Sequence, residues 1–493
     1  MKEVTSAPIV ELDAGALRGA WDDDGVAVFR GIPYAAPPVG TLRFQPPQAA
    51  ARWTELRDAS RFGPIAPQLP SRLGRIMGDF RLPQGEDCLT LNVWTPSKGG
   101  PLLPVLFWLH GGAFTSGAGS IDWYSGRSFA ASRRVVVVTI NYRLGPLGFL
   151  FWPGLSEGNL GLLDQIAALR WVKANIARFG GDPDAITVAG QSAGARSTGH
   201  LMANPETASL FRRAILQSGP VGQLPATPDQ AAAVTRDYLG LLEIDRGNAA
   251  ELQRVPADRL IQAAGELARR TKRFADSRVP FNAVDDGKVV KGGPLAAIEN
   301  GAAPGIDVLA GTTRDESAAH LVFDEDVLGA DETQVLRHFA QLFGAKAEAK
   351  LAEIRRRRAG GTAYDVLVQL GTDVTFAQAT AAFTAARAKH GERAFLYHFD
   401  WQSPYPRLGA CRCLELPFVL DNFQNWPGAP ILAGAIPAIT RGLARSMHQA
   451  WLSFIETGDP NCGGVPAWPP YAMDGRATMR FDSVIEVAGD LIL

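Results

Sequence analysis

The segment Gly190-Gln191-Ser192-Ala193-Gly194 constrains the fold of this chain more than any other feature. Residues 185–189 before it form a short apolar run suited to a buried strand, and residues 193–202 after it have the composition of a helix. A tight strand-to-helix turn exposes a serine hydroxyl, and the small flanking glycines permit that turn. The following helix also directs its N-terminal dipole at a developing negative charge. The context therefore predicts that Ser192 is a nucleophile.

Other segments indicate an α/β fold built on a mostly parallel sheet. Residues 105–109 and 135–140 are continuous apolar runs, typical of strands buried on both faces. Between residues 160 and 179 the apolar side chains recur every three or four positions, which indicates one face of a helix. Further strand-sized runs lie at 306–310 and 394–399. We expect a central sheet covered by helices, with large insertions.

The domain organisation is expected to be simple. The chain has 493 residues and shows no internal repeat, low-complexity tract or linker, so we predict one domain spanning residues 1–493. The insertions at roughly 65–85 and 220–300 are expected to supply the side chains that shape a substrate pocket.

Composition limits the partners of the chain. Lysine plus arginine total 49 against 50 aspartate plus glutamate, so we expect no nucleic-acid or membrane partner and favour a small neutral ligand. We find neither a signal-peptide pattern nor an apolar run long enough to cross a bilayer, and we expect a cytoplasmic protein. The cysteines form no metal-ligand pattern with the histidines, so neither a metal nor another cofactor is predicted. Free thiols are expected at Cys88, Cys411, Cys413 and Cys462.

A second glycine-rich segment, His110-Gly111-Gly112-Ala113-Phe114, directly follows the apolar run that ends at Leu109. Its placement is typical of a loop that stabilises an oxyanion. Glycines let backbone N–H groups approach a substrate carbonyl, and the N–H of Ala193 would add a further donor. Together with Ser192, this loop favours acyl-transfer chemistry.

Several further segments resemble those of the type-B carboxylesterase and cholinesterase-like family of α/β-hydrolases. They are Phe29-Arg30-Gly31-Ile32-Pro33-Tyr34-Ala35, Pro37-Pro38-Val39-Gly40, Glu86-Asp87-Cys88-Leu89-Thr90-Leu91-Asn92-Val93, Asn141-Tyr142-Arg143-Leu144-Gly145, Phe179-Gly180-Gly181-Asp182-Pro183 and Phe211-Arg212-Arg213-Ala214-Ile215-Leu216-Gln217-Ser218-Gly219. The resemblance implies an α/β-hydrolase fold and ester cleavage through an acyl-enzyme on the serine. It also implies oxyanion donors at Gly112, Ala113 and Ala193.

The resemblance shows two smaller departures. The family usually has glutamate where this chain has Gln191. Its secreted members pair the cysteine that matches Cys88 with one shortly upstream, where this chain has Ala66. The second departure supports the cytoplasmic prediction.

The same resemblance implies that Glu316, in Gly311-Thr312-Thr313-Arg314-Asp315-Glu316, is the acid of a catalytic triad. Such an acid orients a histidine and stabilises its imidazolium form. Asp315, in the same charged segment, is predicted to be a solvated surface residue.

The family's histidine falls in the segment Gly409-Ala410-Cys411-Arg412-Cys413-Leu414-Glu415-Leu416-Pro417-Phe418, and Arg412 stands at its position. Arginine keeps its proton near neutral pH, so Arg412 cannot be the general base. We predict instead that Arg412 pairs with Glu316. No other histidine is predicted to be a base. His110 and His200 belong to the loop and helix of the site, His398 and His448 to structural positions, and His320, His338 and His390 to surface segments.

Three hypotheses about function follow. The first is a carboxylesterase scaffold that acylates Ser192 with a small neutral ester and is impaired by Arg412. The second is a non-catalytic binding or adhesion protein on the same fold, which the intact Ser192, Glu316 and oxyanion loop disfavour. The third keeps the enzyme but changes the bond to an amide or carbamate, which the same acyl-enzyme chemistry handles.

Overall fold

The computed structural model describes residues 6–96 and 100–489. Within these residues, eleven strands form one sheet in the order β16-β15-β14-β13-β12-β11-β7-β8-β6-β4-β3. The strands are β3 (Ala20–Trp21), β4 (Ala27–Pro33), β6 (Thr90–Thr95), β7 (Leu103–Leu109), β8 (Val136–Ile140), β11 (Gly181–Gln191), β12 (Arg213–Gln217), β13 (Asp307–Thr313), β14 (Ala394–Phe399), β15 (Ala477–Phe481) and β16 (Glu486–Gly489). The neighbours from β8 through β15 pair in parallel, whereas β3, β4, β6 and β16 are antiparallel to their neighbours. The predicted mostly parallel sheet is confirmed.

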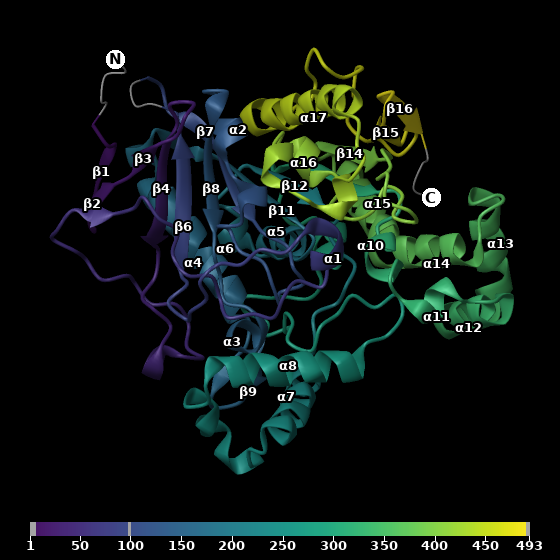
Figure 1. Ribbon diagram of the computed structural model, residues 1–493, viewed down its shortest axis with the longest axis horizontal. Helices are drawn as coiled ribbons and strands as arrows, with labels where there is room; N and C mark the ends of the chain where they lie inside the picture. Colours follow the sequence, from purple (N-terminus) through teal and green to yellow (C-terminus); the bar gives the residue numbers. More distant parts are fainter. Residues whose placement is uncertain (1–5, 97–99, 490–493) are drawn as a thin grey trace.

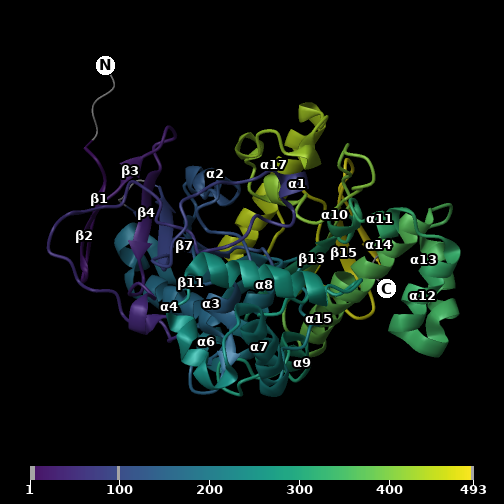
Figure 2. The ribbon, with the colours of Figure 1, turned by 60° about the horizontal axis from the view of Figure 1, so that its bottom comes forward.

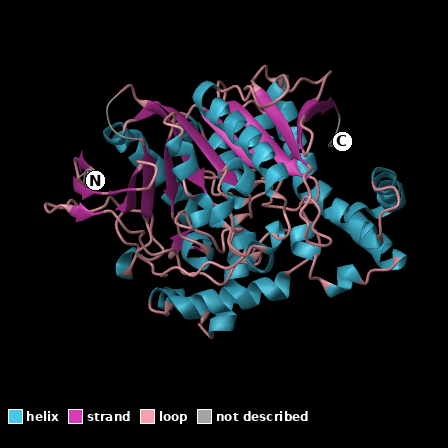
Figure 3. Cartoon of the chain, turned by 45° about the horizontal axis from the view of Figure 1, so that its top comes forward, coloured by secondary structure: helices cyan, strands magenta, loops and turns pink. Residues whose placement is uncertain are grey.

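Helices cover both faces of this sheet (Figure 3). Side chains alternate along a strand, so Phe107 and Leu109 of β7 enter one hydrophobic core while Leu106 and Trp108 enter another. The first core includes side chains of α4 and α5, and the second includes those of α2 and α17. The helices that pack on the sheet are α2 (Arg127–Ala131), α4 (Leu160–Asn175), α5 (Ala193–Ala203), α15 (Gln378–Lys389) and α17 (Pro437–Thr457).

The remaining helices lie in the connections and insertions. They are α1 (Gly74–Met77), α3 (Gly145–Phe149), α6 (Pro205–Ala208), α7 (Pro228–Leu242), α8 (Ala257–Thr271), α9 (Pro294–Glu299), α10 (Ala318–Leu321), α11 (Glu325–Leu328), α12 (Glu332–Phe343), α13 (Ala347–Arg357), α14 (Ala363–Thr372) and α16 (Leu416–Val419). Two small sheets lie apart from the main one, β1 (Ile9–Leu12) with β2 (Gly15–Arg18) and β5 (Arg57–Asp58), and β9 (Phe151–Trp152) with β10 (Ser156–Glu157). Helices α7 and α8 form a layer at the bottom of Figure 1 that comes forward in Figure 2, and α12 and α13 project at the side.

The order of strands brings the predicted site residues to one edge of the sheet. The carboxyl ends of parallel strands meet at the same edge, and ligands of open α/β sheets bind there. Strand β7 ends directly before His110, β11 directly before Ser192, and β13 three residues before Glu316. Within the described residues, no helix is long and apolar enough to cross a membrane.

Candidate active site

Ser192 lies on a strained turn between β11 and α5. Its backbone angles are φ 61° and ψ −121°, a conformation that residues other than glycine rarely adopt. The turn is held where the Ser192 N–H donates to the Gln217 carbonyl oxygen, at 2.8 Å. A Cβ atom on Gly194 would lie 2.0 Å from the Leu109 carbonyl oxygen, and one on Gly190 would lie 2.4 Å from the Gly194 carbonyl carbon. Both glycines are therefore required by the close approach of the two strands and the helix.

We predict that Gly194→Ala lowers the free energy of unfolding by about 3 kcal/mol, because the new methyl group collides with backbone that cannot move aside cheaply. Gly240→Ala is the matched control. Gly240 lies in α7 with no atom near its Cβ position, so alanine there should raise stability by roughly 0.5–1 kcal/mol. Guanidinium unfolding followed by circular dichroism measures both. Equal stability of the two variants would contradict the steric argument.

The glycine-rich loop after β7 packs against this turn. A Cβ atom on Gly111 would lie 3.0 Å from the Ser192 Cβ, so the loop and the serine are in contact. Gly112 and Ala113 have φ values of 116° and 55°. Among the described residues, none accepts a hydrogen bond from the N–H groups of Gly112, Ala113 or Ala193. Three donors are thus left free beside the serine.

His110, the first residue of the loop, is held in place by Tyr142. Its ring stacks on Tyr142 at 4.2 Å between centroids, and the Tyr142 hydroxyl donates to the His110 carbonyl oxygen at 2.8 Å. Burial lowers the pKa of His110 to about 4, so the ring is neutral near pH 7. Its Nδ1 also lies 2.8 Å from the Gly111 carbonyl oxygen, so the ring has a structural role in the loop.

Glu316 is fully buried, and each of its oxygens has a partner. One oxygen accepts from the Thr313 N–H at 3.0 Å, and the other accepts from Arg412 Nη1 at 2.6 Å. The predicted pairing of Arg412 with Glu316 is confirmed. Arg412 also donates from Nη2 to the Ser218 carbonyl oxygen at 2.9 Å, and its guanidinium lies 4.1 Å from the centre of the Phe376 ring.

The prediction that Asp315 is a solvated surface residue is wrong. Asp315 is only 5% exposed; it pairs with Arg314 at 2.8 Å and with Arg358. It also accepts a hydrogen bond from the Ala410 N–H at 2.8 Å. These partners offset the cost of burying the charge, and the two arginines lower the pKa of Asp315 against the opposing effect of burial.

Asp315 also fixes the position of Arg412. Its own N–H donates to the Ala410 carbonyl oxygen at 2.9 Å, which forms a short bridge between the two segments. Gly409 has φ 54°, and a Cβ atom there would lie 2.3 Å from an Asp315 carboxylate oxygen. The clamp between Asp315 and residues 409–411 holds the next side chain, Arg412, against Glu316.

A second buried carboxyl group, that of Glu415, lies near this pair. It accepts from Gln217 Nε2 at 3.4 Å. Burial, and after it the charge of Glu316, raise the pKa of Glu415 to about 8. Glu415 is therefore mostly protonated near pH 7, and Glu316 is the carboxylate that neutralises Arg412.

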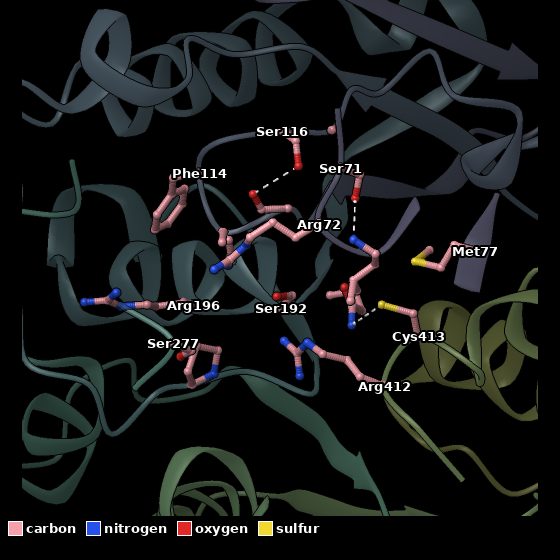
Figure 4. A pocket seen from close by; sticks show the side chains of 18 of the residues that line it. Ser71, Arg72, Met77, Phe114, Ser116, Ser192, Arg196, Ser277, Arg412 and Cys413 are labelled. Carbon is pink, nitrogen blue, oxygen red and sulfur yellow. Dashed lines mark hydrogen bonds between the residues drawn. The ribbon is translucent and has the colours of Figure 1, made fainter. Parts of the chain in front are cut away.

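A pocket opens in front of Ser192 and is shown in Figure 4. It is lined by Gly112, Ala113, Ser192, Ala193 and Arg412, so the structure brings these predicted residues together. Residues 71–80 and 220–282 supply much of the remaining wall, as expected for the two insertions. Gln191, which replaces the usual glutamate, donates to Cys413 Sγ at 3.3 Å beside the pocket.

His320 is exposed at the surface, as predicted, and it also lines the mouth of this pocket. Its short helix α10 follows the Glu316 segment, and Arg72 and Arg412 line the same pocket. Partial desolvation at the pocket mouth, with the charges of these two arginines, lowers the pKa of His320. Sequence reasoning did not place it at the pocket, because no local pattern distinguishes a surface histidine at a pocket mouth from any other.

The remaining histidines lie outside the pocket. His398 contacts Asp400 at 3.1 Å, His448 contacts the Val419 carbonyl oxygen at 2.9 Å, and His200 is buried in α5. The cysteines Cys88, Cys411, Cys413 and Cys462 are all free. Across residues 6–96 and 100–489, no cluster of side chains suited to hold a metal ion is present.

Comparison with known proteins places this architecture in a family. The model of the carboxylesterase family matches residues 6–488. The chain belongs to that family. It is 40% identical to phenmedipham hydrolase of Pseudarthrobacter oxydans over 98% of this chain and 97% of that protein. It is 38% identical to para-nitrobenzyl esterase of Bacillus subtilis, covering 98% of this chain and 96% of that protein.

Solved structures agree with this assignment. The crystal structure of a carboxylesterase from Geobacillus stearothermophilus superposes with a TM-score of 0.87 at 39% identity, covering 98% of each chain. The fold is therefore that of the α/β-hydrolase carboxylesterases, as the sequence predicts, and the chain is an esterase-type hydrolase by family.

Proposed function

We propose that this carboxylesterase-family chain attacks small esters with Ser192 and that Arg412 slows the reaction. The observation that carries the proposal is the site itself. Ser192 lies on a strained turn beside three free N–H donors. Arg412 donates a hydrogen bond to Glu316, the acid that would otherwise orient a histidine. The proposed nucleophile and oxyanion donors are therefore in place, and the proton acceptor is missing.

The chemistry follows from these positions. The Ser192 Oγ would attack the ester carbonyl carbon, and the N–H groups of Gly112, Ala113 and Ala193 would stabilise the resulting oxyanion. Expulsion of the alcohol leaves an acyl group on Ser192, which water then removes as the acid. Each step needs a group that takes up and returns a proton. Since Arg412 stays protonated, it cannot take up the hydroxyl proton, and turnover is slow.

The scope of the reaction is proposed from the relatives and the fold. The names of phenmedipham hydrolase and para-nitrobenzyl esterase support a small ester, with a carbamate as the related alternative. The main sheet draws strands from β3 near the start of the chain to β16 near its end, which supports a single domain over residues 1–493. A cytoplasmic location stays a prediction from the sequence.

A non-catalytic binding protein is the second candidate. One observation favours it: the carboxylate of Glu316 is fully committed to Thr313 and Arg412, so nothing in the pair is free to relay a proton. The backbone strain at Ser192 favours the enzyme, because such strain costs free energy and here exposes the hydroxyl that would attack a substrate.

A fluorophosphonate probe separates these candidates. We expect the Arg412→His variant to be labelled on Ser192 much faster than the unaltered protein, because histidine can take the proton that the serine loses. The variant carrying both Arg412→His and Ser192→Ala should not be labelled, as read by mass spectrometry. A folded Arg412→His protein that stays unlabelled would favour the binding protein.

A further inference from the structure

The pocket in front of Ser192 has an unusual charge. The charged side chains that line it include three arginines, and within the described residues no aspartate or glutamate lines it. The arginines are Arg72, Arg196 and Arg412, and Figure 4 shows them arranged around Ser192. The pocket encloses about 850 Å³, including the part open to solvent. Glu316 neutralises Arg412, so two positive charges remain to be explained.

Arg196 carries the first of these charges. It lies on α5 one turn after the nucleophile, where its N–H donates to the Ser192 carbonyl oxygen at 2.9 Å, and it is 2% exposed. Its Nη1 donates to the side-chain oxygens of Asn282 at 2.9 Å and Gln223 at 3.1 Å, while its Nε has no partner among the described residues. Amide oxygens solvate the cation but do not neutralise it. Arginines are almost never buried without a pairing charge.

Two further facts show that this charge persists. Burial, with the nearby charge of Arg278, lowers the pKa of Arg196 only to about 10, so the side chain stays protonated near neutral pH. The groups that accept hydrogen bonds from its guanidinium belong to Gln223, Asn282 and Leu224, and all of them are neutral. The field inside the pocket is therefore positive.

Arg72 carries the second charge at the mouth of the pocket. In the part of the chain that the structure describes, no acidic side chain lies within ion-pair distance of it. Arg72 is exposed at the pocket mouth, where partial desolvation and then the charge of Arg412 lower its pKa. Water solvates this exposed guanidinium, and an anion that enters the pocket would find it without a competing carboxylate.

We propose that this pocket binds a carboxylate, and that the substrate is an ester whose hydrophobic or aromatic body carries one. The aromatic side chains of Phe80, Trp123 and Phe376 line the same pocket and suit such a body. The inference rests on the proposed function in one respect, that this pocket is the substrate site. It replaces the neutral ligand expected from the net charge of the whole chain, because the local charge of a pocket is independent of the total.

Calorimetric titration of the full chain at low salt tests this proposal with benzoate and its neutral counterpart benzamide. We expect benzoate to bind about tenfold more tightly than benzamide, as for a charge-assisted hydrogen bond. Arg72→Gln and Arg196→Gln should each weaken benzoate by about tenfold and leave benzamide unchanged. Arg170→Gln is the matched control, since Arg170 is an exposed arginine on α4 outside the pocket and should leave both affinities unchanged.

Equal binding of benzoate and benzamide, or no binding of either, would overturn the proposal, as would unchanged benzoate affinity in both pocket variants. Arg72 is at the surface, so its variant keeps the test valid if Arg196→Gln fails to fold. The measurement is at equilibrium and does not depend on turnover. If benzoate shows no preference but Arg412→His is labelled by the fluorophosphonate, only carboxylate recognition is overturned. If benzoate binds as expected but Arg412→His is not labelled, only the proposed hydrolysis is overturned.

Discussion

Replacing Arg412 with histidine is expected to raise kcat/KM for p-nitrophenyl acetate and butyrate by between about 10² and 10⁴. This is the usual contribution of a well-placed general acid or base. The gain relies on the other proposed parts of the site: Ser192 lies on its strained turn, and the Gly112 and Ala113 N–H groups are free. Glu316 would accept a hydrogen bond from the introduced imidazole in place of Arg412. Initial rates at pH 7.5 measure the effect.

Matched variants show whether the gain is chemical. Arg412→Gln removes the same cation without adding a base, so it should leave the rate near that of the unaltered protein. Adding Ser192→Ala to Arg412→His should abolish the gain. A rise of the same size in Arg412→Gln would mean that Arg412 merely blocks the pocket. No activity in any variant, with folding intact, would favour the binding protein.

A residual rate in the unaltered protein has one internal candidate for its base, His320. It lines the pocket, and its lowered pKa makes it neutral but weakly basic at pH 7. If His320→Ala abolished the residual rate, the proton would pass to His320 rather than to solvent, and position 412 would matter less than we propose.

The parts of the site that could be predicted from the sequence are those fixed by local geometry. The turn at Ser192 and the loop at Gly112 depend on glycines beside strand-sized apolar runs, so pattern alone located them. The pairing of Arg412 with Glu316 needed only charge and the resemblance of two segments. The β7 and β8 strands followed from runs that are apolar at successive positions, because both faces of a central strand are buried.

What sequence could not supply depends on contacts between distant segments. Asp315 has the composition of a surface loop residue, and only Arg358 and the Ala410 N–H, which the fold brings to it, explain its burial. The charge of the pocket is hidden in the same way. Arg196 and Arg72 are ordinary arginines in the sequence, and their lack of acidic partners is a property of the assembled pocket. Net charge, which is close to zero, gave the opposite expectation.

Glu316→Gln is expected to lower the free energy of unfolding by about 3–5 kcal/mol, because it leaves the buried cation of Arg412 without its carboxylate. The amide oxygen can still accept from the Thr313 N–H, so the variant removes the charge and little else. Arg412 is 3% exposed and keeps only the Ser218 carbonyl oxygen and the Phe376 ring. Loss of the Glu316 charge also lets the nearby Glu415 ionise more readily, and the new carboxylate would partly neutralise Arg412. The loss of stability should therefore fall toward the lower end of this range. Urea unfolding at pH 7 measures it.

The origin of this loss is isolated by two further variants. Combining Glu316→Gln with Arg412→Met removes both charges, and the double variant should recover most of the lost stability because no buried charge is left unpaired. Glu456→Gln breaks an exposed ion pair, in which the Glu456 side chain is 22% exposed and the Arg134 side chain 43% exposed. This variant should lower the free energy of unfolding by less than about 1 kcal/mol. If Glu316→Gln cost no more than Glu456→Gln, the pair at the triad position would behave as a solvated surface contact. The proton-acceptor site would then be open to water, and the slow turnover attributed to Arg412 would need another cause.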